Sequence, residues 1–179
     1  YFQDLKFCEP FRSELKKRLI PQKSLNQDDK FLRKKMLESH YSVSVHVRRG
    51  DYAYDPKINK VHGTCKWKYY KEALELIARK YNLSTFRKLH LYIFSDDIDW
   101  VKKEMFFPKN SVFVSNKNRD DVIEHYLMRG CNNHIIANST FSWWSSFLSD
   151  NNNFVVYPSL WFSNKKSKPN IFLSSWVSV

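Results

Sequence analysis

The sequence predicts an α/β domain with a Rossmann-like, doubly wound parallel sheet that is covered by helices on both faces. Apolar runs of strand length alternate with amphipathic stretches of helix length over most of the chain. The chain has 179 residues, 42% of them hydrophobic, which is enough to bury one core. Only three glycines and six prolines occur, which argues against a fibrous or low-complexity protein.

The first forty residues precede the alternating region and are expected to be peripheral helices. Glu9–Ile20 and Lys30–Ser39 carry apolar residues at helical spacing, and Pro21 separates the two stretches. We therefore divide the chain into a helical segment, 1–40, and a Rossmann-like domain, 41–179.

From Ser42 onward, strands and helices are expected in alternation. Valine occupies every second position of Ser42–Val47, which is typical of a strand with one apolar face. Asn151–Asn153 and Ser163–Lys168 are expected to be loops within the domain. The remaining strands are predicted at Leu89–Phe94, Ser111–Val114, His134–Ala137 and Phe154–Tyr157, and the helices at Trp67–Tyr81, Asp97–Glu104, Asp120–Cys131 and Phe141–Leu148.

The charge balance suggests an anionic partner. The net charge is +12, which fits a nucleic acid, a membrane surface, a phosphorylated small molecule or simply a solvated basic surface. The three cysteines are widely spaced and form no CxxC pair, which argues against a disulfide framework and against a zinc site. A chain without a disulfide framework is expected in a reducing compartment. No apolar run approaches the roughly 18 residues that a membrane-spanning helix needs.

Three polar clusters follow predicted strands, at the edge of the sheet where open α/β folds bind ligands. They are His46–Tyr52 after the first strand, Ser95–Asp97 after the second, and Asn138–Ser142 after the fourth. Because the carboxyl ends of parallel strands share one edge, the three clusters are expected to form one site.

Arg48 is the first choice for a phosphate contact. A guanidinium matches phosphate oxygens bidentately and keeps its charge, so arginines at a strand end can neutralise a pyrophosphate without Mg²⁺. Strand alternation places Arg48 on the face of Ser44 and His46 and directs Arg49 away. The alternative is an ordinary ion pair, and for Arg49 a pair with an internal carboxylate.

The other polar residues have two interpretations each. Asn138–Thr140 precedes a predicted helix and is either an anion site or a plain N-cap. A carboxylate could accept hydrogen bonds from guanine, and the candidates are Glu124, Asp121 and Asp120. Asp96–Asp97 is expected to cap the following helix instead.

The three clusters resemble a known family. His46–Tyr52, Phe94–Trp100 and Ile135–Trp144 are similar, in this order, to the successive motifs of α-1,2-fucosyltransferases, glycosyltransferase family eleven. The resemblance runs from the start of the chain to Pro158 and Trp161. It implies a GT-B architecture of two facing Rossmann-like domains, of which 41–179 would be the C-terminal, GDP-fucose-binding half. The segment 1–40 would be left from, or lead out of, an N-terminal acceptor domain.

The resemblance also implies roles for individual residues. Arg48 would hold the pyrophosphate, His46 would lie against the nucleotide, and Glu124 would bind guanine where an aspartate is expected. The general base is Asp51, His46 or a group outside this chain. The expected donor-binding set is His46, Arg48, Arg49, Glu124, Asn138, Ser139, Thr140 and Ser142, and the expected catalytic residues are Arg48 and Asp51.

The function implied by the resemblance is inverting, metal-independent transfer of L-fucose from GDP-fucose to the 2-hydroxyl of galactose in a glycan. No cofactor and no nucleic-acid partner are expected, and membrane association is expected only through segments outside this chain. The location would be the cytoplasm in a microbe and the Golgi lumen in a eukaryote. The alternatives are a non-catalytic GDP-sugar-binding module, or an inactive fragment of such an enzyme, and a basic nucleic-acid binder.

Overall fold

One parallel sheet organises the domain in the computed structural model, which describes residues 3–151, 154–163 and 169–179. Within these residues the sheet has six strands in the order β3-β2-β1-β4-β5-β6, and every pair is parallel. The predicted doubly wound fold is therefore confirmed. The strands are β1 Ser42–Val47, β2 His90–Ser95, β3 Val112–Phe113, β4 Asn133–Ile135, β5 Phe154–Tyr157 and β6 Val177–Ser178.

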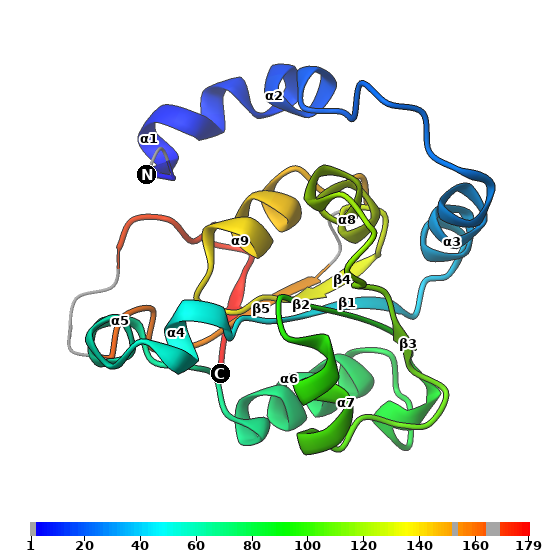
Figure 1. Ribbon diagram of the computed structural model, residues 1–179. Helices are drawn as coiled ribbons and strands as arrows, with labels where there is room; N and C mark the ends of the chain where they lie inside the picture. Colours follow the sequence, from blue (N-terminus) through cyan, green and yellow to red (C-terminus); the bar gives the residue numbers. More distant parts are fainter. Residues whose placement is uncertain (1–2, 152–153, 164–168) are drawn as a thin grey trace.

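Helices cover both faces of the sheet. Helices α8 (Asp121–Met128) and α9 (Thr140–Phe147) lie on one face, and α6 (Trp67–Lys80) and α7 (Ile98–Glu104) lie on the other (Figure 1). None of the described helices is both long enough and apolar enough to span a membrane.

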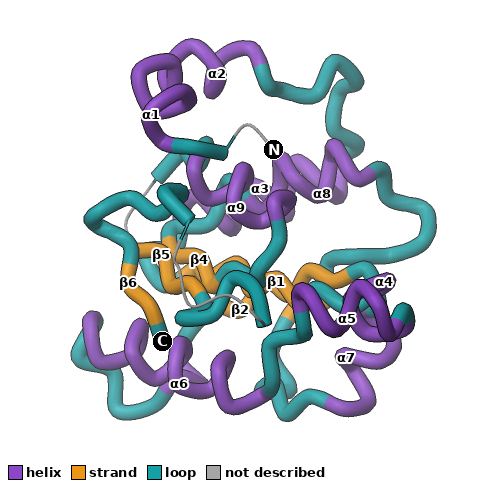
Figure 2. Tube along the Cα trace, turned by 90° about the vertical axis from the view of Figure 1, so that its left-hand side faces the viewer, coloured by secondary structure: helices purple, strands orange, loops and turns teal. Residues whose placement is uncertain are grey.

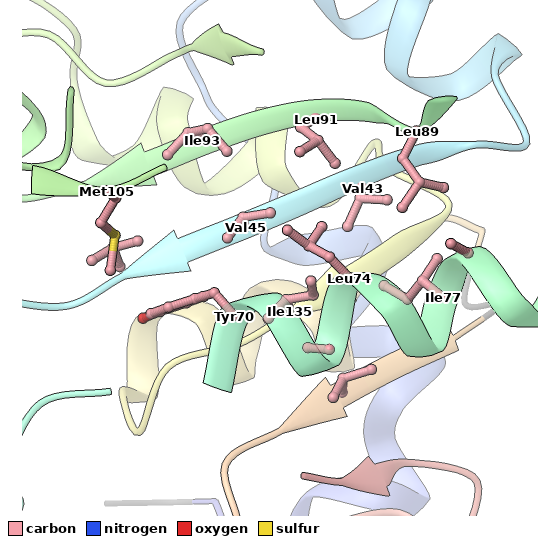
Figure 3. Close-up of a cluster of buried hydrophobic side chains, with 14 of the residues drawn as sticks. Val43, Val45, Tyr70, Leu74, Ile77, Leu89, Leu91, Ile93, Met105 and Ile135 are labelled. Atoms are coloured by element: carbon pink, nitrogen blue, oxygen red, sulfur yellow. The ribbon is translucent and has the colours of Figure 1, made fainter. Parts of the chain in front are cut away.

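The central strand β1 separates two kinds of environment. Its valines, including Val43 and Val45, are buried against Leu74 and Ile77 of α6 (Figure 3). On its other face, Ser44 hydrogen-bonds the ring of His134 at 2.7 Å, and the ring of His46 lies 5.5 Å from that of Phe141 on α9. The apolar face holds the strand in the core. The polar face carries Ser44 and His46, and His46 lies next to the last residue of the strand.

The N-terminal helices are α1 (Leu5–Cys8), η1 (Glu9–Phe11), α2 (Arg12–Arg18) and α3 (Gln27–Glu38). Arg12 donates to the carbonyl of Phe147 at 2.6 Å, and Arg129, which is 1% exposed, donates to the carbonyls of Lys16 and Leu19. Leu5 N–H donates to the carbonyl of Asn170 at 3.1 Å. The helical segment that the sequence predicts is thus bound directly to the Rossmann-like domain.

Several elements differ from the prediction. The single helix expected over Glu9–Ile20 is divided into η1 and α2. The 3-10 turn η1 contains a proline in its first positions, and the α-helix α2 begins only after it, at Arg12. Two short helices, α4 (Gly50–Tyr54) and α5 (Pro56–His62), follow β1 and lie side by side (Figure 2). Asp55 caps α5 by accepting from the N–H of Lys57 and Ile58. Asn152, Asn153 and 164–168, in two predicted loops, lie outside the described residues.

Candidate functional site

A cavity of about 550 Å³ opens at the carboxyl ends of β1, β2 and β3. It therefore lies where the strand-end rule places a ligand site. Its lining residues are His46, Arg48, Phe94, Ser95, Asp96, Asp97, Ile98, Asp99, Ser115, Asn116, Lys117, Arg119, Asp121, Glu124 and Phe141.

Arg48 is held at this cavity by two carboxylates. Its Nη1 donates to Asp96 Oδ2 at 2.7 Å, and its Nη2 donates to Asp51 Oδ1 at 2.6 Å. The guanidinium also lies 5.0 Å from the centroid of the Tyr52 ring, and the side chain is 30% exposed. These two hydrogen bonds use two of the five N–H donors of an arginine. The group is therefore fixed in position and retains donors for a further anion.

Arg49 points to the opposite side of the sheet. Its Nε donates to Asp97 Oδ2 at 3.0 Å, and its guanidinium lies 3.3 Å from the centroid of the Trp100 ring on α7. Burial acts to raise the pKa of Asp97, but hydrogen bonds from Tyr54 and Arg49 outweigh it and leave that pKa below its usual value. The internal ion pair is the arrangement that the structure shows for Arg49, which is absent from the described cavity lining.

Asp96, which follows β2, contacts both Arg48 and Arg49, which follow β1. Besides its bond to Arg48, its Oδ1 accepts from the backbone N–H of Arg49 at 2.8 Å. Burial raises the pKa of Asp96, partly offset by that N–H and by the charge of Arg48. The expectation that Asp96–Asp97 caps α7 holds in position for Asp97, which is the N-cap residue, and not for Asp96. The closest hydrogen bonds of the Asp97 side chain are with Arg49 and Tyr54. Both carboxylates thus bind arginines.

Gly50 is required by this contact. Its φ is +26°, and a Cβ added there would lie 2.5 Å from Asp96 Oδ2. At that distance the Asp96 carboxylate would have to move, and the positive φ disfavours an L side chain, so glycine suits the turn from β1 into α4 this close to Asp96.

Glu124 marks the other end of the cavity. Its Oε2 accepts from the Ser115 hydroxyl at 2.6 Å, and its Oε1 accepts from the Asn116 N–H at 3.3 Å. Burial raises the pKa of Glu124, and these two hydrogen bonds partly offset the effect. Of the two other acidic candidates, Asp121 also lines the cavity, whereas Asp120 caps α8 through the N–H of Val122.

His46 forms a neutral, buried part of the lining. Its pKa is lowered to about 3, mainly by burial, and the nearby charges of Arg48 and His125 contribute to this shift. Its Nδ1 is buried and has no hydrogen-bond partner among the described residues. A group with so low a pKa is a weak base near neutral pH. His46 is also only 5% exposed, whereas the Asp51 side chain is 46% exposed, and this difference favours Asp51 of the two candidates in this chain.

The Asn138–Ser142 segment lies beside this cavity. Asn138 is buried and donates to the carbonyls of His62 at 2.8 Å and Trp161 at 3.3 Å, and the buried Ser142 hydroxyl lies 3.3 Å from the carbonyl of Ser139. Ser139 is the N-cap residue of α9 and makes no capping hydrogen bond with its side chain in the described part of the structure. Thr140 lines a neighbouring cavity of about 630 Å³. None of these four belongs to the described lining of the 550 Å³ cavity.

The structure thus brings His46, Arg48 and Glu124 into one cavity, with Asp51 attached through Arg48. Two sets of contacts were not predicted from the sequence: that of Asp96 with Arg48, and those of Ser115 and Asn116 with Glu124. Ser115–Asn116 follows the third predicted strand, so the same strand-end rule applied there would have found it. In the described ranges, no group of three or more His, Cys, Asp or Glu residues is arranged to hold a metal ion.

Comparison with known proteins gives consistent matches. A model of "Glycosyl transferase family 11" matches residues 11–179. The chain is 32% identical to the O-antigen biosynthesis glycosyltransferase WbnK of Escherichia coli over 189 residues, 100% of this chain and 59% of that protein. It is 36% identical to an alpha-1,2-colitosyltransferase of Escherichia coli over 129 residues, 70% of this chain and 42% of the relative.

A third relative comes from an animal. The chain is 26% identical to a galactoside 2-alpha-L-fucosyltransferase of Caenorhabditis elegans over 168 residues, 88% of this chain and 43% of that protein. The chain therefore spans between 42% and 59% of the length of these relatives.

Proposed function

Because the chain belongs to glycosyl transferase family 11, we propose that it binds GDP-fucose and transfers L-fucose to the 2-hydroxyl of a galactose in a glycan acceptor. The transfer inverts the anomeric centre and needs no metal ion. In this proposal 41–179 is the donor-binding domain of a GT-B architecture, and 1–40 leads out of the domain that binds the acceptor.

The observation that carries the proposal is the charge arrangement of one cavity. A fixed guanidinium, Arg48, lies in its lining together with a buried carboxylate, Glu124. A guanidinium pairs with phosphate oxygens, and a carboxylate accepts from the N1–H and the exocyclic amine of guanine. A guanosine diphosphate carries both complementary groups in one molecule, as the proposed donor does.

The proposed chemistry is a single displacement. The acceptor hydroxyl attacks the anomeric carbon, the bond to the diphosphate oxygen breaks, and GDP leaves. Arg48 stabilises the negative charge that grows on the leaving diphosphate. The first backbone N–H groups of α9, which have no acceptor within their own helix, are proposed as further donors, because Phe141 of this helix lines the cavity. Asp51, which is bonded to Arg48 and about half exposed, takes the acceptor proton.

The donor sugar and the turnover are separate parts of the proposal. The names of the relatives include a colitosyltransferase as well as a fucosyltransferase, so GDP-colitose is the competing donor. The second candidate function is a GDP-sugar-binding module without turnover, which would follow if Asp51, held in its ion pair with Arg48, does not take the acceptor proton. Release of GDP from GDP-fucose that increases when lactose is added supports the enzyme, whereas tight binding without release supports the module.

The donor-site proposal is tested by calorimetric titration of GDP in EDTA. We expect Arg48→Ala to weaken GDP binding on the order of 100-fold, because a charge-assisted phosphate contact is lost from a partly buried site. The matched control is Arg87→Ala, which removes an exposed arginine from η2 (Phe86–Lys88), near the opposite end of β2. Equal GDP affinity in the parent and in Arg48→Ala would refute the phosphate role.

A further inference from the structure

The hydroxyl of Ser115, in the segment that follows β3, connects this segment with β2 and with α8. It accepts from the backbone N–H of Ser95, the last residue of β2, at 3.0 Å, and it donates to Glu124 Oε2 on α8 at 2.6 Å. Ser115 and Glu124 are only 7% and 8% exposed, so water does not replace these contacts easily. The hydroxyl has one proton, and because Ser95 N–H can only donate, that proton is committed to Glu124.

The neighbouring loop is fixed as well. Arg119 donates to the carbonyl of Val114 and, through its Nε, to Asp29 on α3 at 3.1 Å. Asp29 is buried. The segment between β3 and α8 is therefore held at Val114, Ser115 and Arg119, and Asn116 N–H can donate to Glu124 from a constant position.

The Glu124 carboxylate has acceptor positions that these contacts leave available for a ligand. An ionised carboxylate has about four acceptor positions on its two oxygens. Ser115 occupies one on Oε2 and Asn116 occupies one on Oε1. With respect to the residues that the structure describes, each oxygen therefore keeps one acceptor position. Guanine offers two adjacent donors, N1–H and the 2-amine, and matches this pair, whereas adenine presents a ring-nitrogen acceptor at the same edge and is repelled.

We infer that Ser115 is a positioning residue that sets the base selectivity of the nucleotide site by holding Glu124 as a paired, proton-free acceptor. The inference rests on the proposed function, because it requires that Glu124 meets the base of the donor. It assigns to Ser115 a role that a simple packing residue does not have: its hydroxyl decides which protonation state of Glu124 faces the ligand.

The protonation state matters because a protonated carboxyl pairs with adenine. It donates O–H to the ring nitrogen and accepts from the 6-amine, so a neutral Glu124 tolerates the wrong base. Burial favours the neutral form and raises the pKa of Glu124, Asp121 adds to the rise, and Ser115, Asn116 and Arg119 oppose it. Removal of the Ser115 hydroxyl therefore moves the loss of guanine selectivity to higher pH.

The test compares GDP, IDP and ADP by calorimetry on the full chain at pH 5 and pH 8. IDP keeps N1–H but lacks the 2-amine. We expect Ser115→Ala to reduce the preference for GDP over ADP on the order of tenfold, with a larger reduction at pH 5 than at pH 8. Ser115→Thr, which keeps the hydroxyl, should stay close to the parent.

Ser42→Ala is the matched control for loss of a buried seryl hydroxyl. The Ser42 hydroxyl also accepts from a backbone N–H, that of Asn132 at 2.9 Å, and donates at 2.6 Å, to the carbonyl of Met36. It lies at the amino end of β1, far along the strand from Arg48. Its removal costs similar hydrogen bonds and should leave the GDP-to-ADP ratio unchanged.

Two results would overturn the inference while the donor site stands: an unchanged GDP-to-ADP ratio in a folded Ser115→Ala, or an equal loss of selectivity in Ser42→Ala. A parent that binds ADP as well as GDP would instead refute the guanine assignment itself, and the inference with it. Thermal unfolding without nucleotide shows in each case whether the variant is folded.

Discussion

The contact between Gly50 and Asp96 provides a sharp test of how the site is built. In Gly50→Ala the new Cβ would lie 2.5 Å from Asp96 Oδ2, 3.5 Å from Asp96 Cγ and 3.9 Å from Arg48 Cζ. The carboxylate must move, and it then loses its geometry with Arg48 Nη1 and with the Arg49 N–H. The positive φ adds about 1–2 kcal/mol for an L-residue.

The positive φ and the displaced ion pair of Asp96 with Arg48 are together expected to lower the free energy of unfolding by about 1–3 kcal/mol. For a chain of this size, that lowers the Tm by roughly 3–10 °C. Circular dichroism measures the Tm, and calorimetry measures GDP affinity, which should fall about tenfold because Arg48 is no longer fixed.

Gly63→Ala is the control for this variant. Gly63 also has a positive φ, +63°, but among the described residues its added Cβ would meet only Ser163 Cβ, at 3.5 Å. It should lose stability without losing GDP affinity. Unchanged Tm and GDP affinity in Gly50→Ala, or an equal loss of affinity in Gly63→Ala, would show that the close approach of Gly50 to Asp96 does not position Arg48.

Three further predictions concern the body of the domain. Burial lowers the pKa of His46 and of His134 to about 3, below the usual 6.5, so their contribution to stability is complete above pH 6.5 and is lost as pH falls toward 3. The free energy of unfolding should therefore decrease by about 1.4 kcal/mol per pH unit for each histidine below pH 6.5, and a urea midpoint at pH 5 that equals the midpoint at pH 7.5 would contradict this. Arg49→Lys loses the stacking on Trp100 and should lower the free energy of unfolding by about 1 kcal/mol in urea titrations, whereas an unchanged midpoint would show that the ring contact contributes nothing. Arg129→Met leaves carbonyls of the N-terminal segment without their donor and should cost about 3 kcal/mol and speed amide hydrogen exchange in 12–20; slow exchange there would show that the segment is held by other contacts.

The sheet could be predicted from the sequence because its long strands carry a strong local signal. Alternating valines identify β1, and continuous apolar runs identify β2 and β5. By contrast, β6 has two residues, and it exists because Val177 and Ser178 pair in register with Val156 and Tyr157. Two residues carry no periodicity, so tertiary pairing alone defines that strand. The α5 helix did have a local signal, Asp55 followed by Pro56.

The site could be predicted in part, for a similar reason. The strand-end rule located Arg48 and the segment after β2, and the alternation of β1 directed Arg48 and Arg49 to opposite faces. The pairing of Arg48 with Asp96 follows from register, because Val47 lies opposite Ser95. Register between distant strands cannot be read from either strand alone, so the two aspartates were interpreted as helix caps.

The most direct test of the account is a crystal structure of the chain grown with GDP in EDTA. We expect diphosphate oxygens within hydrogen-bond distance of the Arg48 guanidinium, and the guanine N1 and 2-amine facing Glu124, in the cavity at the ends of β1, β2 and β3. GDP bound elsewhere, or lying in the cavity with its base away from Glu124 and its phosphates away from Arg48, would contradict this expectation.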